Sequence, residues 1–183
     1  MLIDAGKSSL LIVDVQEKLL PAMADGSGVV QQCSVLLKAA KALDVPVAVS
    51  EQYPKGLGHT VGALRGEIGN AGVFQKLAFS CWRDVSLRAH LTGLHDAGRP
   101  QVIVAGIEAH VCVLQSALDL AQAGFGVFVV ADGISSRVES SKTLALARMG
   151  HAGIGVINTE MAVFELLGKA GTPEFKELSA LIK

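Results

Sequence analysis

The chain has 183 residues, of which half are hydrophobic, and its formal net charge is -1. This even balance offers no basic cluster to displace counterions from phosphate, and an aromatic content of 4% offers little surface for base stacking, so we expect no nucleic-acid partner. No stretch resembles a signal peptide or a membrane-spanning helix, so we expect no membrane partner.

The length suits one domain over residues 1–183 with a single sizeable core. Three cysteines without framework spacing fit free thiols in a reducing compartment, which predicts a cytoplasmic protein. The mean hydropathy of +0.45 is high for a small monomer. We therefore expect a homo-oligomer that buries part of its apolar surface.

Short, nearly continuous apolar runs recur along the chain, as is typical of strands covered on both faces. They lie at residues 9–13, 46–49, 72–75, 102–105, 126–131 and 153–157. Helical patterns alternate with them, and these end near residue 44 or span residues 85–97, 111–123, 140–150, 161–167 and a segment opening at 172. We expect Thr159 to cap the fifth of these helices and Pro173 to occupy the first turn of the last one.

Six such β/α units predict an α/β fold, a three-layer α/β/α sandwich around a six-stranded parallel sheet. We take the strand order as 3-2-1-4-5-6, which is the common order in doubly wound sheets. The long unpatterned segment at residues 51–70 is then expected to be a lid or interface loop.

Three chemically useful side chains fall at the ends of predicted strands. Asp14 ends the first strand, Lys76 ends the third, and Cys112 follows the fourth. Because ligands in doubly wound sheets bind beyond the carboxyl ends of the strands, we expect an acid, a cation and a thiol to converge at one edge. Together they fit a nucleophile, its base and a cation that stabilises their charge.

Each of these residues also has an ordinary structural explanation. A lone cysteine is more often packed than reactive, and that is our expectation for Cys33 and Cys81. Cys112 differs because it lies in the first turn of a predicted helix, where the dipole favours a thiolate. Asp14 could simply cap the segment that follows it, and Lys76 could be an exposed lysine at the rim.

Other known sites lack their required residues. "DVQEKLLP" after the first strand has no glycine-rich turn for a dinucleotide, and "CVLQSAL" has no arginine to hold a phosphate. His110 is two residues from Cys112 in the same turn, which is poor geometry for a base. The histidines lack metal-ligand spacing, so we expect neither a metal nor a cofactor.

Several motifs in order resemble one family over nearly the whole chain. They are "LLIVDVQEKL", "EQYPKGLG", "QKLAFSCW", "AGIEAHVCVLQSALDL", "ADGISSR" and "NTEMAVFEL". The chain resembles the isochorismatase-like cysteine hydrolases, which include nicotinamidases and carbamoylsarcosine amidases, and it is most similar to the branch of isochorismatase domain-containing proteins.

This resemblance implies a Rossmann-like fold and a catalytic triad of Asp14, Lys76 and Cys112. Asp14 would take the thiol proton, Cys112 would attack a carbonyl, and Lys76 would hold Asp14 in place. The resemblance also implies an oxyanion hole made by the backbone N–H groups of Glu108 and Cys112, with a cis peptide bond at Ile107–Glu108.

The chain departs from parts of the superfamily in three ways. "SEQYPKGLGH" lacks the Asp-x-His metal motif of nicotinamidases, so we expect no metal there. Isochorismatases that cleave an enol ether lack the cysteine, which this chain retains. Ala109 and His110 stand where many relatives have a Thr–Asp pair.

The expected substrate pocket is lined by Gln16, Leu19, Tyr53 and Trp82. We therefore predict a metal-independent cysteine hydrolase that cleaves an amide or related C–N bond of a small molecule. Two alternatives stay open. One is a vinyl-ether hydrolase that uses Asp14 and Lys76 alone, and the other is a non-catalytic oligomer with a redox-responsive or packed thiol.

Overall fold

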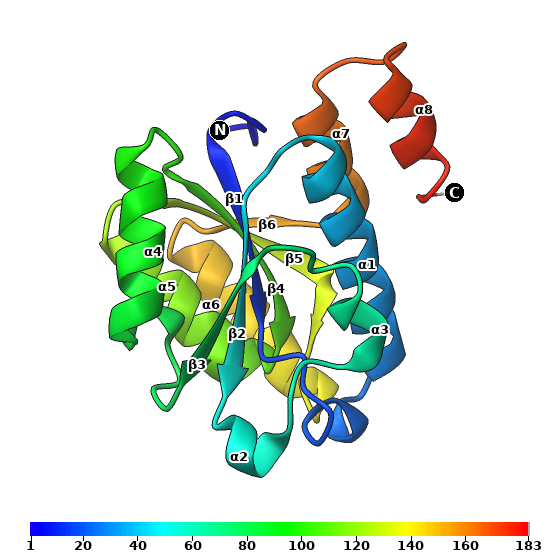
Figure 1. The fold of residues 1–183 in the computed structure, drawn as a ribbon. Helices are drawn as coiled ribbons and strands as arrows, with labels where there is room; N and C mark the ends of the chain where they lie inside the picture. The colour runs from blue at the N-terminus through cyan, green and yellow to red at the C-terminus, as the bar shows by residue number, and fades with distance from the viewer. Residues whose placement is uncertain (183) are drawn as a thin grey trace.

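The centre of the protein is one sheet of six parallel strands, seen in a computed structural model that describes residues 1–182 (Figure 1). The strands are β1 (Ser8–Val13), β2 (Val47–Gln52), β3 (Gly72–Lys76), β4 (Gln101–Ile107), β5 (Gly126–Ser135) and β6 (Gly155–Ile157). Their order, β3-β2-β1-β4-β5-β6, confirms the prediction.

The helices lie on both faces of this sheet, as predicted (Figure 1). The longer ones are α1 (Gly26–Ala42), α4 (Val85–Asp96), α5 (Leu114–Gln122), α6 (Glu139–His151), α7 (Thr159–Leu167) and α8 (Pro173–Ser179). Short turns of helix also occur at η1 (Leu20–Ala22), α2 (Pro54–Leu57), α3 (Gly62–Arg65), η2 (Cys81–Arg83) and the π-helical turn η3 (Ala109–Val113).

Alternation along the strands divides the core into two main layers. In β1, Leu10 and Ile12 pack with residues of α1 and α7 on one face of the sheet. Leu11 and Val13 pack with residues of α4, α5 and α6 on the other. Both faces of β1 are therefore buried, which explains why its sequence is a continuous apolar run.

Three local predictions require correction. Asn158, rather than Thr159, caps α7, because the Asn158 side chain accepts a hydrogen bond from the Met161 N–H. Glu51 and Gln52, expected in a loop, belong to β2. The helix expected from residue 111 begins as η3, and α5 starts only at Leu114. The expected place of Pro173 in the first turn of α8 is confirmed, and Thr172 caps this helix by accepting a hydrogen bond from the Phe175 N–H.

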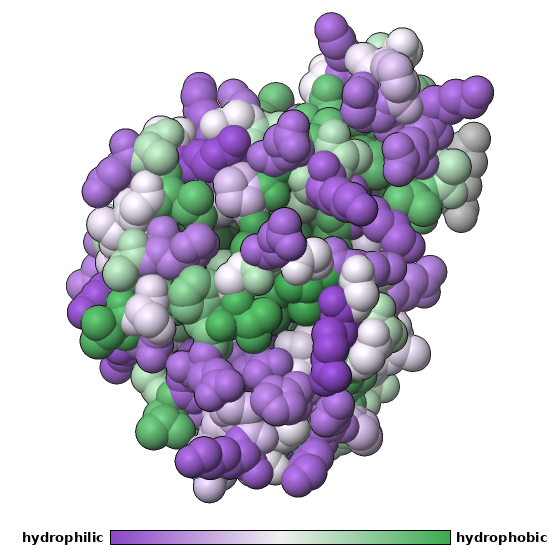
Figure 2. Space-filling view, in the orientation of Figure 1, coloured by the Kyte–Doolittle hydropathy of each residue, from purple (hydrophilic) through white to green (hydrophobic). Residues whose placement is uncertain are grey.

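The surface mixes polar residues with apolar ones, and an apolar area lies near the middle of the face shown in Figure 2. Large apolar side chains that are exposed include Val73, Leu77, Phe79, Leu144 and Phe164. No helix within residues 1–182 is both long and apolar enough to cross a bilayer.

Candidate active site

The sheet brings the three predicted residues to its carboxyl edge, the edge at which all six strands end. Asp14 directly follows β1, and Lys76 is the last residue of β3. Cys112 lies in η3, which follows β4. Because β1 pairs with both β2 and β4, the ends of these strands lie next to one another. Lys76 on β3 reaches past β2 to Asp14, so the two side chains predicted to converge are in direct contact.

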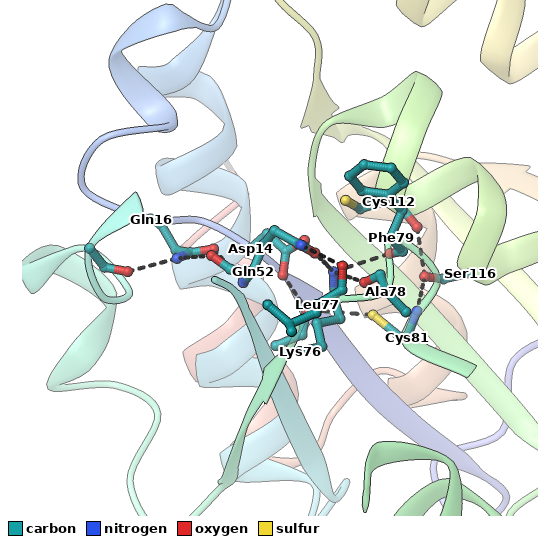
Figure 3. A network of polar contacts seen from close by, with 12 residues as sticks. Asp14, Gln16, Gln52, Lys76, Leu77, Ala78, Phe79, Cys81, Cys112 and Ser116 are labelled. Carbon is teal, nitrogen blue, oxygen red and sulfur yellow. Dashed lines mark hydrogen bonds and ion pairs between the residues drawn. The ribbon is translucent and has the colours of Figure 1, made fainter. Parts of the chain in front are cut away.

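Asp14 and Lys76 form a buried ion pair (Figure 3). The Lys76 Nζ lies 2.7 Å from the Asp14 Oδ2, and neither side chain is exposed to solvent. The same ammonium donates to the Gln52 Oε1 at 2.7 Å and to the carbonyl oxygens of Ala78 and Phe79 at 3.3 and 3.1 Å. Burial lowers the pKa of Lys76, but the charge of Asp14 and its hydrogen bond to the ammonium act in the opposite direction, and the pKa is raised. The N–H groups of the Lys76 ammonium therefore all have oxygen acceptors within the protein.

Cys112 is 5% exposed and lies beside this ion pair. Burial raises the pKa of its thiol well above the usual range, and the charge of Asp14 acts in the same direction. Lys76 opposes these effects without overcoming them. Burial and a neighbouring anion thus act against the thiolate that the position at a helix N-terminus favours.

This arrangement pairs a nucleophile with a base. A neutral thiol next to a carboxylate can pass its proton to that carboxylate as the sulfur attacks an electrophile. Lys76 keeps a positive charge next to the carboxylate at rest. The site can therefore separate charge during attack without an external base.

The backbone before Cys112 adopts the expected irregular form. The peptide bond at Ile107–Glu108 is cis, which confirms the prediction. Glu108 itself is 8% exposed, and its carboxylate is held by Arg137, whose Nε lies 3.0 Å from the Glu108 Oε2. The two backbone donors expected to form an oxyanion hole thus belong to an anchored segment, and their role stays a prediction.

Two of the four expected pocket residues lie close to Lys76. The Gln16 amide joins β2 to the loop after it, since its Nε2 donates to the carbonyl oxygens of Gln52 and Gly58. Tyr53 and Lys76 both line a cavity of about 500 Å³.

The other two pack within apolar clusters. Leu19 packs against the core next to α1. Trp82 packs with its ring centroid 5.4 Å from that of Phe125. Both have contacts that an ordinary core residue would have.

Three residues in the network were not predicted from the sequence. Ser50 donates to the Asp14 Oδ1 at 2.7 Å, Gln52 accepts from Lys76, and the Cys81 thiol lies 3.5 Å from the Ser50 Oγ. A usable signal existed for two of them. Ser50 and Gln52 are polar residues two apart just after the predicted strand at 46–49, and continuing that strand to residue 52 places both on one face.

Two of the histidines form hydrogen bonds outside the Asp14–Lys76 network. The His110 Nδ1 lies 2.9 Å from the Ser136 Oγ, and the His59 Nδ1 lies 2.9 Å from the Glu51 Oε2. Across residues 1–182, no three His, Cys, Asp or Glu side chains gather in a way that could hold a metal ion.

The chain is similar to known proteins over almost its whole length. Residues 8–161 match the isochorismatase domain family. Isochorismatase domain-containing protein 2 of Homo sapiens is 40% identical over 182 residues, covering 97% of this chain and 84% of the relative. A Phytophthora sojae protein described as the secreted isochorismatase effector Isc1 is 38% identical over 179 residues, covering 96% and 84%.

A solved structure also matches the fold of the whole chain. The Caenorhabditis elegans protein described as MAR1 ribonuclease has a TM-score of 0.92 and 36% identity, covering 100% of this chain and 92% of that chain. The span of this chain that matches the family, residues 8–161, includes the positions of Asp14, Lys76 and Cys112.

Proposed function

The chain belongs to the isochorismatase family of hydrolases, and from this premise we propose that it is a metal-independent cysteine hydrolase acting on a small molecule. The bond cleaved is an amide or a related C–N bond, and the reaction passes through a covalent intermediate on Cys112. The observation that carries this proposal is the fully buried Asp14–Lys76 pair beside the Cys112 thiol. Burying two charges is costly, and such a pair next to a nucleophile has a chemical use that packing alone does not supply.

In the first half-reaction, Asp14 takes the proton of the Cys112 thiol while the sulfur forms a bond to the carbonyl carbon. The resulting oxyanion accepts hydrogen bonds from the backbone N–H groups of Glu108 and Cys112, and one such donor is typically worth about 3 kcal/mol. When the C–N bond breaks, Asp14 returns the proton to the leaving nitrogen. The product of this step is a thioester and a free amine or ammonia.

In the second half-reaction, water attacks the thioester carbonyl and Asp14 takes one of its protons. The C–S bond then breaks, the carboxylic product leaves, and the proton returns to the Cys112 sulfur. Lys76 stays protonated throughout and holds the Asp14 carboxylate in place. The cycle thus consumes one water and restores the resting thiol.

Domain organisation, oligomeric state and cellular compartment are inferred from the length, the surface and the cysteines of the chain. We infer a single domain over residues 1–183 and a homo-oligomer, the latter because large apolar side chains such as Leu77 and Phe79 are exposed. We place the protein in the cytoplasm because its three cysteines are free thiols. The relative from Phytophthora sojae is described as secreted, so the compartment needs its own test by fractionation.

The proposal is tested by measuring ammonia or amine release from a panel of small primary amides, carbamoyl compounds and ureides. We expect Cys112→Ala to lose at least about 10³-fold in rate, because no nucleophile remains. Cys33→Ala is the matched control, since it removes another buried thiol that lies outside the site. It should retain the wild-type rate.

Two further substrates separate the alternatives. Isochorismate tests vinyl-ether cleavage, for which Cys112→Ala would keep the wild-type rate. A single-stranded RNA is included because the Caenorhabditis elegans relative is described as a ribonuclease. Cleavage of either compound by Cys112→Ala, with no amide hydrolysis by the wild type, would refute a cysteine hydrolase.

A further inference from the structure

Ser50 binds Asp14 at two points. Its backbone carbonyl accepts from the Asp14 N–H at 3.1 Å, and its hydroxyl donates to the Asp14 Oδ1 at 2.7 Å. Lys76 holds the other carboxylate oxygen. Ser50 is fully buried, so no water competes for either contact. Donors on both oxygens fix the carboxylate plane while leaving lone pairs for a third partner.

Cys81 determines where the Ser50 hydroxyl points. The Cys81 Sγ lies 3.5 Å from the Ser50 Oγ and donates to it. Burial raises the pKa of Cys81 to about 11, with the Asp14 charge acting in the same direction, so the group stays a thiol and therefore a donor. A hydroxyl has one proton, and with Cys81 on an oxygen lone pair that proton is directed to Asp14.

Cys81 is also tied to Cys112 through its backbone. The Cys81 N–H donates to the Ser116 Oγ at 2.8 Å, and the Ser116 hydroxyl donates to the Cys112 carbonyl oxygen at 2.6 Å (Figure 3). Ser116 is fully buried. One residue therefore contacts, through one intermediate each, both the expected base and the expected nucleophile.

We propose that Ser50 is a positioning residue for Asp14, oriented by the Cys81 thiol. Its hydrogen bond fixes the Asp14 carboxylate in one orientation, from which it accepts the Cys112 proton. This inference rests on the proposed function, because it gives Ser50 and Cys81 their roles through Asp14 and Cys112. Cys81, which the sequence places among packed thiols, thereby becomes part of the site's supporting network.

The test is the pH dependence of Cys112 alkylation by iodoacetamide, measured at each cysteine by peptide mass spectrometry. In Ser50→Ala the Asp14 carboxylate loses the hydrogen bond that fixes it and takes the Cys112 proton less readily, so we expect Cys112 to react roughly threefold more slowly at a given pH. Ser8→Ala is the matched control. Ser8 is also a fully buried strand serine, and its hydroxyl donates at 2.9 Å to the Gln101 amide oxygen at the other edge of the sheet.

Asp14→Asn separates this inference from the proposed function. It removes the base that takes the Cys112 proton, so Cys112 should react at least about tenfold more slowly at a given pH, a larger loss than in Ser50→Ala. If Asp14→Asn reacts as fast as the wild type or faster, Asp14 is not the base for Cys112 and the proposed function falls. If Asp14→Asn has its effect while Ser50→Ala matches Ser8→Ala, or is faster, only the role of Ser50 is overturned.

The part played by Cys81 is tested by two substitutions in the same assay. Cys81→Ser keeps a donor to the Ser50 oxygen and should leave the Cys112 profile close to wild type. Cys81→Ala removes the donor and should reproduce part of the Ser50→Ala effect. Identical profiles for the two variants would show that Cys81 does not orient Ser50.

Discussion

Buried polar side chains gather at both edges of the same sheet, and the two clusters differ in their charges. At the amino edge, where the strands begin, the Ser8 hydroxyl donates to the Gln101 amide oxygen, and the Gln101 Nε2 donates to the Leu2 carbonyl. Arg99, which lies nearby, donates to the carbonyl oxygens of Ala5 and Ser8. Each of these hydrogen bonds has a neutral acceptor, either the Gln101 amide oxygen or a backbone carbonyl oxygen.

The carboxyl edge instead buries opposite charges next to a thiol. Asp14 and Lys76 have no solvent exposure and are joined at 2.7 Å, with Cys112 beside them. The comparison shows that buried polarity by itself does not mark a site, because backbone groups must be satisfied wherever the chain is buried. A buried ion pair beside a nucleophile needs another explanation, which the proposed chemistry provides.

The largest expected effect comes from breaking that ion pair. Lys76→Met leaves the Asp14 charge buried without its partner, so we expect a loss of about 3–5 kcal/mol in the free energy of unfolding. Urea unfolding monitored by circular dichroism measures it. The double variant Asp14→Asn with Lys76→Met removes both charges and should recover most of the loss. If the single variant were as stable as wild type, the pair would not be a buried, charged one.

A smaller effect concerns a buried thiol away from the site. Burial, followed by the Asp132 charge, raises the pKa of Cys33 from 9.0 to about 12. Because the folded value lies above the unfolded one, the stabilisation is complete below pH 9.0 and is lost as the pH rises towards 12. The loss for one thiol is about 1.4 kcal/mol per pH unit.

Cys33→Ala removes that titration while keeping all others. The difference in unfolding free energy between wild type and Cys33→Ala should therefore shrink by about 2 kcal/mol between roughly pH 9 and 10.5. Urea unfolding under reducing conditions, repeated across that range, checks it. A constant difference would mean that Cys33 ionises equally in both states.

The smallest effect is expected at the amino edge. Ser8→Ala removes one buried neutral hydrogen bond and leaves the Gln101 amide with other partners, so unfolding should cost about 1 kcal/mol less. The hydrolysis rate should not change. A loss of rate comparable to that of a carboxyl-edge substitution would contradict the functional difference between the two edges.

The sequence predicts the fold and the three central side chains for the same physical reason. Long apolar runs identify buried strands, and polar residues directly after such runs, such as Asp14 and Lys76, must lie at one edge of a parallel sheet. The strand order then brings them together.

The remaining contacts depend on information that patterning does not contain. The Ser50 contact requires the register between β1 and β2, which pairs Val13 with Ser50. The Cys81 contact requires the path of the short turn η2. The protonation state of Cys112 depends on burial and on the Asp14 charge, neither of which can be read from its position at a helix start.

The central claim is that Cys112 becomes acylated during turnover, and intact-protein mass spectrometry tests it most directly. The wild type, quenched in acid during incubation with the amide panel, should gain the mass of one acyl group. Peptide mapping should place that group on Cys112, and hydroxylamine should remove it. Cys112→Ala should show no such gain, whereas Cys33→Ala should behave as wild type. Hydrolysis without any adduct, at a rate that Cys112→Ala retains, would contradict the account.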